Sequence, residues 1–161
     1  LDDFRKIFGR NAVHFNAPGA SCHHVVNPWL KAEGVRYLDT PWLNREHQGT
    51  GKYKRSLNST GQRTPEGLIR MVRNVVFEPG DGSGRDWTSF TMRQIEAAFR
   101  MQKPAIISSH RVNFCGHIDP ANRVNGIGSL RHLLNAIVKK YPDVEFLSST
   151  ELGEIIEKEG R

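Results

Sequence analysis

His110 is the residue of this sequence best suited to acid–base chemistry. It follows directly on residues 105–109, a short run after Pro104 that is typical of a buried strand. An imidazole gains and loses its proton near neutral pH, so a histidine at the end of such a strand can deliver a proton to a reacting group. The competing interpretation is a structural histidine whose ring is held by a neighbouring loop.

Other polar residues occupy equivalent places along the chain. Side chains that can bind a ligand stand at or after the ends of the predicted strands, and these are Asn16, Asp39, Glu78, His110 and residues 148–150. In parallel α/β folds, ligands bind where the carboxyl ends of the strands meet. We therefore expect these residues to converge on one rim.

The elements that must position these residues alternate between short apolar strands and helices. Strands are predicted at residues 12–16, 35–38, 70–78, 105–109 and 144–147. Helices are predicted at residues 2–8, 27–33 and 127–141. A further helix is predicted to open at Thr91 and to stop at Pro104, and a last one to follow a capping box formed by Ser148 and Glu151. Residues 39–65, 80–88 and 110–125 are predicted loops.

The order of these elements contains no run of hairpins, so it predicts a parallel sheet with helices outside it. A chain of 161 residues can bury one core, and we expect residues 1–161 to form a single domain. Five strands are fewer than the eight of a closed barrel, so either the sheet is open or the start of a barrel is absent.

Two of the three tryptophans belong to predicted loops on the expected rim. Trp42 and Trp87 can stack an aromatic face on a sugar ring there, and packing into the core is an equally valid interpretation. Trp29 lies beside Leu30 in a predicted helix, and we expect it in the core.

Several segments resemble the polysaccharide-deacetylase superfamily of the NodB type. Residues 104–123 (PAIISSHRVNFCGHIDPANR) and 142–156 (PDVEFLSSTELGEII) resemble the end of its catalytic domain, and the upstream runs FNAP, GVRYLD and RNVVFEP fall in the expected order. The resemblance implies an α/β fold, a partial (β/α) barrel with mostly parallel strands whose N-terminal strands are missing from the chain. It also implies removal of acetyl groups from N-acetylated sugars, a divalent metal (zinc or similar) in the full-length protein, and an extracellular or periplasmic location.

The resemblance suggests roles for individual residues. His110 matches the general acid that the family places after a strand. Asn16 stands in an Asn-Ala-Pro run where the family has Arg-x-Pro, an element that orients the catalytic base. Asp39 and Trp42 follow the next strand, where the family places a polar residue and an aromatic. The predicted substrate-binding residues are Asn16, Asp39, Trp42, Trp87, Arg111 and Asn113.

No metal ligands are predicted within the chain. Nothing in residues 1–11 resembles the aspartate pair or the His-x-x-x-His motif of the family, so we expect the metal ligands and the general base outside this chain, which alone should be inactive. The remaining cysteines and histidines lack the spacing of a structural zinc site, because adjacent histidines do not easily face one ion. We expect them to be exposed loop residues: Cys22, His23, His24, Cys115 and His117.

The net charge of +6 comes largely from residues 44–73. Such a basic stretch can bind phosphates or acidic polysaccharide, or it can be a solvated loop, which we favour because no series of stacking aromatics accompanies the charge. No apolar run is long enough to span a bilayer, and two cysteines are too few for a disulfide framework. We expect the chain to self-associate, because an incomplete barrel exposes the apolar faces of its strands.

Three functions remain open from the sequence. The first is the C-terminal part of a carbohydrate deacetylase with His110 as the acid. The second is a carbohydrate-binding relative without catalysis, which Asn16 in place of arginine favours. The third is a basic nucleic-acid-binding domain, a reading that depends on charge alone and that we regard as the weakest.

Overall fold

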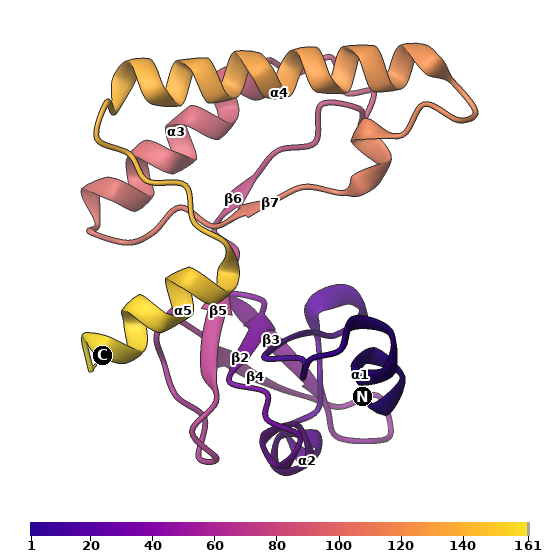
Figure 1. Ribbon diagram of the computed structural model, residues 1–161, viewed down its shortest axis with the longest axis vertical. Helices are drawn as coiled ribbons and strands as arrows, with labels where there is room; N and C mark the ends of the chain where they lie inside the picture. Colours follow the sequence, from indigo (N-terminus) through magenta and orange to yellow (C-terminus); the bar gives the residue numbers. More distant parts are fainter. Residues whose placement is uncertain (161) are drawn as a thin grey trace. The chain divides into compact units, whose positions relative to one another are not determined.

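The computed structural model describes residues 1–160 and divides into two compact units (Figure 1). The first unit consists of Leu1–Val72 and Leu147–Arg161, and the second of Arg73–Phe146. Each unit has a hydrophobic cluster of its own. The expectation that residues 1–161 form one domain stays a prediction, because compact units can also be halves of one domain.

The first unit is built on a parallel sheet. Strands β1 (His14–Asn16), β2 (Tyr37–Thr40) and β5 (Ile69–Val72) lie in the order β1-β2-β5, with Asn16 opposite Asp39. Helix α1 (Asp2–Phe8) ends at Gly9 as predicted, and α2 (Asn27–Ala32) is followed by Gly34 at φ +88°. Two short 3₁₀ turns, η1 (Pro18–Ala20) and η2 (His24–Val26), precede α2. The core is formed by Leu30, Val35, Leu38 and Leu68.

An antiparallel hairpin occupies part of the predicted loop 39–65. Strands β3 (Leu43–His47) and β4 (Tyr53–Leu57) pair with Glu46 opposite Lys54, so the prediction of a loop was wrong for these two segments. Every residue of β4 is exposed, so the strand carries no alternation of apolar and polar residues that a sequence pattern could reveal. Asp39, predicted to follow a strand, is buried within β2.

Helix α5 (Ser149–Lys158) completes the first unit. It begins with the predicted capping box, in which Ser148 and Glu151 exchange hydrogen bonds. Gly153 permits its close approach to the sheet, because a Cβ there would lie 2.4 Å from the ring of Tyr37. Glu157 of α5 pairs with Arg36 and accepts a hydrogen bond from the Tyr37 hydroxyl at 3.2 Å.

The second unit places two helices against two short parallel strands. Strands β6 (Val75–Val76) and β7 (Ile107–Ser108) pair in parallel, and helices α3 (Trp87–Arg100) and α4 (Pro120–Lys140) pack together in Figure 1. Its core contains Val75, Phe77, Ile95, Leu133 and Ile137. The one strand predicted over residues 70–78 is therefore two, β5 and β6, in different units.

Three boundaries in the second unit differ from the prediction. Helix α3 starts at Trp87, before Thr91, because the Asp86 carboxylate accepts the Ser89 N–H at 2.9 Å and caps the first turn. The predicted loop 110–125 contains a 3₁₀ turn, η3 (Arg111–Phe114), and the first turns of α4, which Asp119 caps. Residues 144–147 pair with no strand, so apolar character alone was a misleading signal there.

The architecture is mixed α/β, with parallel pairing in the three-stranded sheet and no closed barrel in the part of the chain that the structure describes. Within residues 1–160, no helix combines the length and the apolar character that crossing a bilayer requires.

Candidate functional site

Glu78 and His110 form a carboxylate–imidazole pair in the second unit. Both follow the parallel strands β6 and β7, whose carboxyl ends emerge on the same edge. The Glu78 Oε1 atom lies 2.7 Å from Nδ1 of His110 and accepts the His110 backbone N–H at 3.2 Å. The His110 side chain is 77% exposed, whereas the Glu78 side chain is only 17% exposed. The predicted convergence of polar residues is thus confirmed for this pair.

Asn113 fixes the carboxylate of this pair. Asn113 is 2% exposed. Its Nδ2 donates hydrogen bonds to Glu78 Oε2 at 2.6 Å and to the His110 carbonyl at 2.8 Å. Its Oδ1 accepts the Gly80 N–H at 2.9 Å. These contacts give Asn113 a positioning role, and the predicted contact with a substrate stays a prediction.

A close approach between η3 and α4 holds Asn113 in place. A Cβ at Gly126 would lie 1.9 Å from the Asn113 carbonyl oxygen, so the two segments can touch only where α4 carries a glycine. Nearby, Asn122 Nδ2 donates to the carbonyls of Val112 and Cys115, each at 2.7 Å. The cluster around Glu78 is therefore anchored on a packed helix.

This arrangement suits proton transfer. A carboxylate can only accept, so Glu78 selects the His110 tautomer with its proton on Nδ1 and leaves Nε2 facing away from the pair. An exposed imidazole oriented by a buried carboxylate can act as a general acid or a general base.

Asn16 and Asp39 are opposite one another on β1 and β2 of the first unit. Asp39 Oδ1 lies 3.2 Å from Nε2 of His14, a residue for which the sequence predicted no role. His14 could have been found by the two-residue period of a strand, because it lies two positions before Asn16 and shares its face. Asn16 and Asp39 belong to the first unit and His110 to the second, so their shared rim stays a prediction.

The remaining predicted residues have varied surroundings. Trp42 follows β2 and is 63% exposed. The Trp87 Nε1 donates to Asp81 at 3.0 Å, and Arg85 lies over its ring at 5.2 Å from the centroid. Arg111 is exposed at the start of η3. Stacking of Trp42 and Trp87 on a sugar stays a prediction, whereas the expectation of a buried Trp29 was wrong because that ring is exposed.

A second cluster joins His23, His24 and Glu46 in the first unit. The Glu46 Oε1 atom lies 2.7 Å from Nδ1 of His24 and 3.5 Å from Nε2 of His23. The two rings stack with their centroids 4.6 Å apart. The expectation that adjacent histidines would not face one point was therefore wrong, and Glu46 was missed because its strand was predicted to be a loop.

Glu46 is buried yet charged. Burial by itself would raise the pKa of its carboxyl group, but hydrogen bonds from His24 and Gln48 outweigh that effect and lower the pKa below its ordinary value. At neutral pH the carboxylate is therefore available as an acceptor or as a metal ligand.

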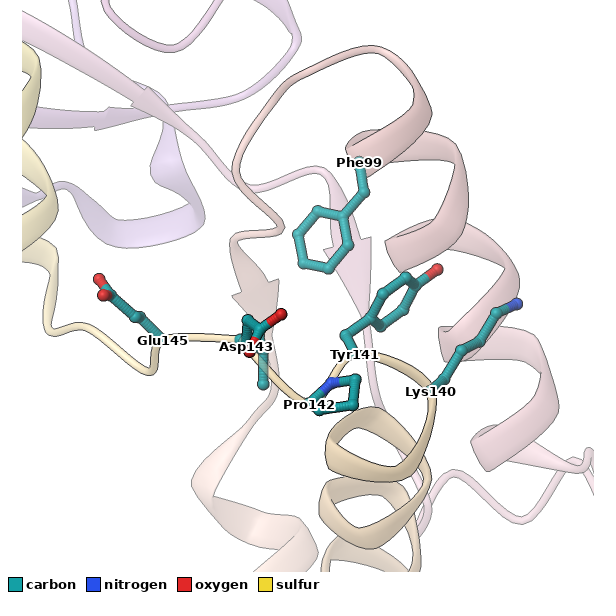
Figure 2. A pocket seen from close by; sticks show the side chains of 7 residues that line it. Phe99, Lys140, Tyr141, Pro142, Asp143 and Glu145 are labelled. Atoms are coloured by element: carbon teal, nitrogen blue, oxygen red, sulfur yellow. The ribbon is translucent and has the colours of Figure 1, made fainter.

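A cavity of about 460 Å³ lies at the end of α4 (Figure 2). Phe99 and Tyr141 form an edge-to-face pair in its wall, with centroids 4.9 Å apart, and Lys140 and Glu145 lie on the same lining. None of the predicted site residues lines this cavity. The candidate chemistry therefore belongs to the Glu78 cluster.

Comparison with known proteins returned no likeness. No protein-family model matches the chain, and no curated protein and no solved structure matches it. The chemistry of the chain is accordingly argued from the geometry of its own residues.

Proposed function

We propose that this chain supplies the acid–base histidine of a hydrolase that removes acetyl groups from N-acetylated sugars. The observation that carries the proposal is the Glu78–His110 pair at the ends of β6 and β7, with the imidazole exposed and the carboxylate held by Asn113. The resemblance of residues 104–123 to polysaccharide deacetylases supplies the reaction class. In this proposal the chain is the C-terminal part of a partial (β/α) barrel.

His110 would protonate the departing amine. Hydrolysis of an N-acetyl group adds water to the amide carbon, breaks the C–N bond and requires a proton on the leaving nitrogen. The imidazolium of His110 donates that proton from Nε2, while Glu78 keeps Nδ1–H bonded and the ring oriented. Positioned proton transfer of this kind contributes roughly 10²–10⁴-fold to a rate.

The divalent metal implied by the resemblance does not fit this cluster. The sequence contains no His-x-x-x-His motif. The cluster offers a single imidazole and a carboxylate whose two oxygens already accept hydrogen bonds, whereas catalytic zinc sites use three protein ligands. The step derived for His110 therefore involves only this chain's own residues.

Acetate release tests the proposal. The polypeptide encoded by the whole reading frame should release acetate from oligomers of N-acetylglucosamine, and His110→Ala should reduce turnover by at least about 100-fold. Glu78→Gln should reduce it by about tenfold or more, because the amide no longer selects the tautomer with the proton on Nδ1. His132→Ala, an exposed histidine on α4, is the matched control and should leave turnover unchanged. Full activity in His110→Ala would remove His110 from the mechanism.

Carbohydrate binding without catalysis is the second candidate. It is favoured by Asn16, which stands where the resembling family has arginine, and by the exposed ring of Trp42. In that case the wild-type polypeptide binds N-acetylated oligosaccharides and releases no acetate, and Trp42→Ala abolishes the quenching of its tryptophan fluorescence by the sugar. Acetate release that depends on His110 decides for the enzyme.

A further inference from the structure

We propose that His23, His24 and Glu46 form a binding site for a divalent transition metal, with zinc as the best-fitting ion. The proposal concerns the first unit alone and does not depend on the function proposed for His110. Imidazole nitrogens and a carboxylate oxygen are ligands that zinc prefers, and two histidines with one acidic residue make a three-ligand set with an open fourth position.

The distances are close to those of a metal site. One ligand atom from each of the three residues lies within 4.8 Å of the other two. In a tetrahedral zinc site, bonds of about 2.0–2.1 Å place the ligand atoms roughly 3.3–3.4 Å apart. The His23–Glu46 separation of 3.5 Å already matches this, and the His24–Glu46 separation of 2.7 Å has to widen slightly.

The protons of the two rings can be rearranged at low cost. His23 Nδ1 accepts the Val25 N–H at 3.2 Å, so a neutral His23 carries its proton on Nε2, toward Glu46. His24 directs Nδ1–H to the same carboxylate. Metal binding moves each proton to the other nitrogen of its ring. It replaces the contacts of the two rings with Glu46 by bonds to the metal, and it breaks the exposed contact with the Val25 N–H. Rings that are protonated must release a proton, so acid should weaken binding.

A small polar cavity adjoins the cluster. It measures about 30 Å³ and is lined by His24 and Glu46 together with Thr40 and Asn58. Asn58 is 5% exposed, and its Oδ1, like the Thr40 Oγ1, has no hydrogen-bond partner among the described residues. The volume accommodates about two water molecules. A water molecule on the open position of the metal would supply donors to these oxygens, which are costly to bury without partners.

Two charged residues near the cluster have opposite effects on a bound cation. Arg70 lines the same cavity and opposes a cation. Glu66 carries a negative charge and favours a cation. Its carboxylate accepts a hydrogen bond at 3.3 Å from Nδ2 of Asn27, which lines the same cavity. Cys22 also lines the cavity, but it lies outside the group of three residues whose ligand atoms are within 4.8 Å of one another. We therefore assign the metal to nitrogen and oxygen ligands and not to a thiolate.

Calorimetric titration of the chain with zinc chloride tests the site. We expect one zinc per chain with a dissociation constant in the micromolar range or below, and a weakening of at least about tenfold in His24→Ala and in Glu46→Gln. His47→Ala is the matched control, because His47 follows Glu46 in β3 and points to the opposite face. It should retain wild-type affinity, and Cys22→Ser should do so as well.

Two further measurements keep the test independent of folding defects. Circular dichroism must show native helix content in each variant. In the wild-type chain, zinc should shift the ring ¹⁵N resonances of His23 Nε2 and His24 Nδ1 and leave those of His47 unchanged. Absence of one-site binding at tens of micromolar zinc would overturn the proposal, as would unaltered affinity in both ligand variants.

Discussion

The two units pair the same side-chain types in different ways. In the second unit, Glu78 directs one oxygen to a single imidazole and the other to Asn113. In the first unit, one oxygen of Glu46 gathers two imidazoles and the Gln48 amide. A carboxylate with one imidazole orients a proton carrier, whereas a carboxylate that faces two imidazoles forms a set of ligands. The number of imidazole rings that face the carboxylate therefore distinguishes the proton transfer proposed for the Glu78 cluster from the metal binding proposed for the Glu46 cluster.

The supports of the two clusters differ as well. The Glu78 cluster is fixed by buried Asn113, which contacts α4 through Gly126 above a core of helix and strand side chains. Glu46 belongs to a hairpin whose second strand is exposed throughout. The Glu46 cluster is therefore the more adjustable of the two, a property suited to ligand binding, and the Glu78 cluster is preorganised.

The largest effect that would sharpen this comparison is expected from Asn113→Ala. The substitution removes the donor to Glu78 and leaves the Gly80 N–H without its acceptor, so we expect the free energy of unfolding to fall by about 3 kcal/mol. Urea denaturation measures the change. Asn135→Ala, on an exposed position of α4, is the control and should cost less than about 0.5 kcal/mol. Equal losses in both variants would mean that Asn113 is not the anchor of the second unit.

The next largest expected effect is a difference in stability between alanine substitutions at two glycines of α4. Gly126→Ala should cost about 1–3 kcal/mol, because its Cβ would collide with the Asn113 carbonyl and push η3 away. Gly128→Ala should instead stabilise the protein by up to about 1 kcal/mol, because a Cβ there meets open space and alanine favours the helix. Thermal denaturation of the pair gives both signs, and a stabilising Gly126→Ala would contradict the close approach.

The first unit contains a buried tyrosine, Tyr37, whose ionisation should make this unit sensitive to alkaline pH. Burial raises the pKa of Tyr37 to about 12, and the charge of Glu157 adds to this effect. The folded state thus favours the neutral phenol, whose contribution is complete below the ordinary value of 10.0 and is lost as the pH rises toward 12. The protection factors of the amides in α5 should fall over this range by the equivalent of about 1–2 kcal/mol.

Tyr37→Phe is the control for that prediction. It removes the titrating hydroxyl, so it should abolish the alkaline loss of protection in α5 while leaving the protection factors in α4 as they were. A pH dependence that persists in Tyr37→Phe would assign the effect to another group.

The smallest effect concerns the hairpin that carries Glu46. Arg45 lies directly opposite Arg55, and like charges in this position repel, so Arg55→Thr should stabilise the hairpin by about 0.5 kcal/mol. Lys54→Thr removes the same charge opposite Glu46 and should destabilise it by a similar amount. Unfolding midpoints at low and high salt measure both. Shifts of the same sign would show that net charge, and not pairing, governs the hairpin.

Local signals in the sequence predicted several elements well. Gly9 sets the C-terminal end of α1, and the Ser148–Glu151 capping box sets the start of α5. Each of these signals depends on residues only a few positions apart. The cap of α3 was missed, because Thr91 resembled a start signal while Asp86 makes the actual bond. Residues 144–147 looked like a strand, but a strand also needs a partner.

The sequence by itself determined the end of α1, the start of α5, the parallel pairing of the main sheet and the place of His110 after a strand. These features depend on neighbouring residues and on the alternation of strands with helices along the chain. Tertiary structure alone decided that Asn113 would be buried against Glu78 and that Glu46 would meet His23 and His24. Both depend on contacts between segments about 22 to 35 positions apart, and such contacts follow from strand register and packing, which no local pattern encodes.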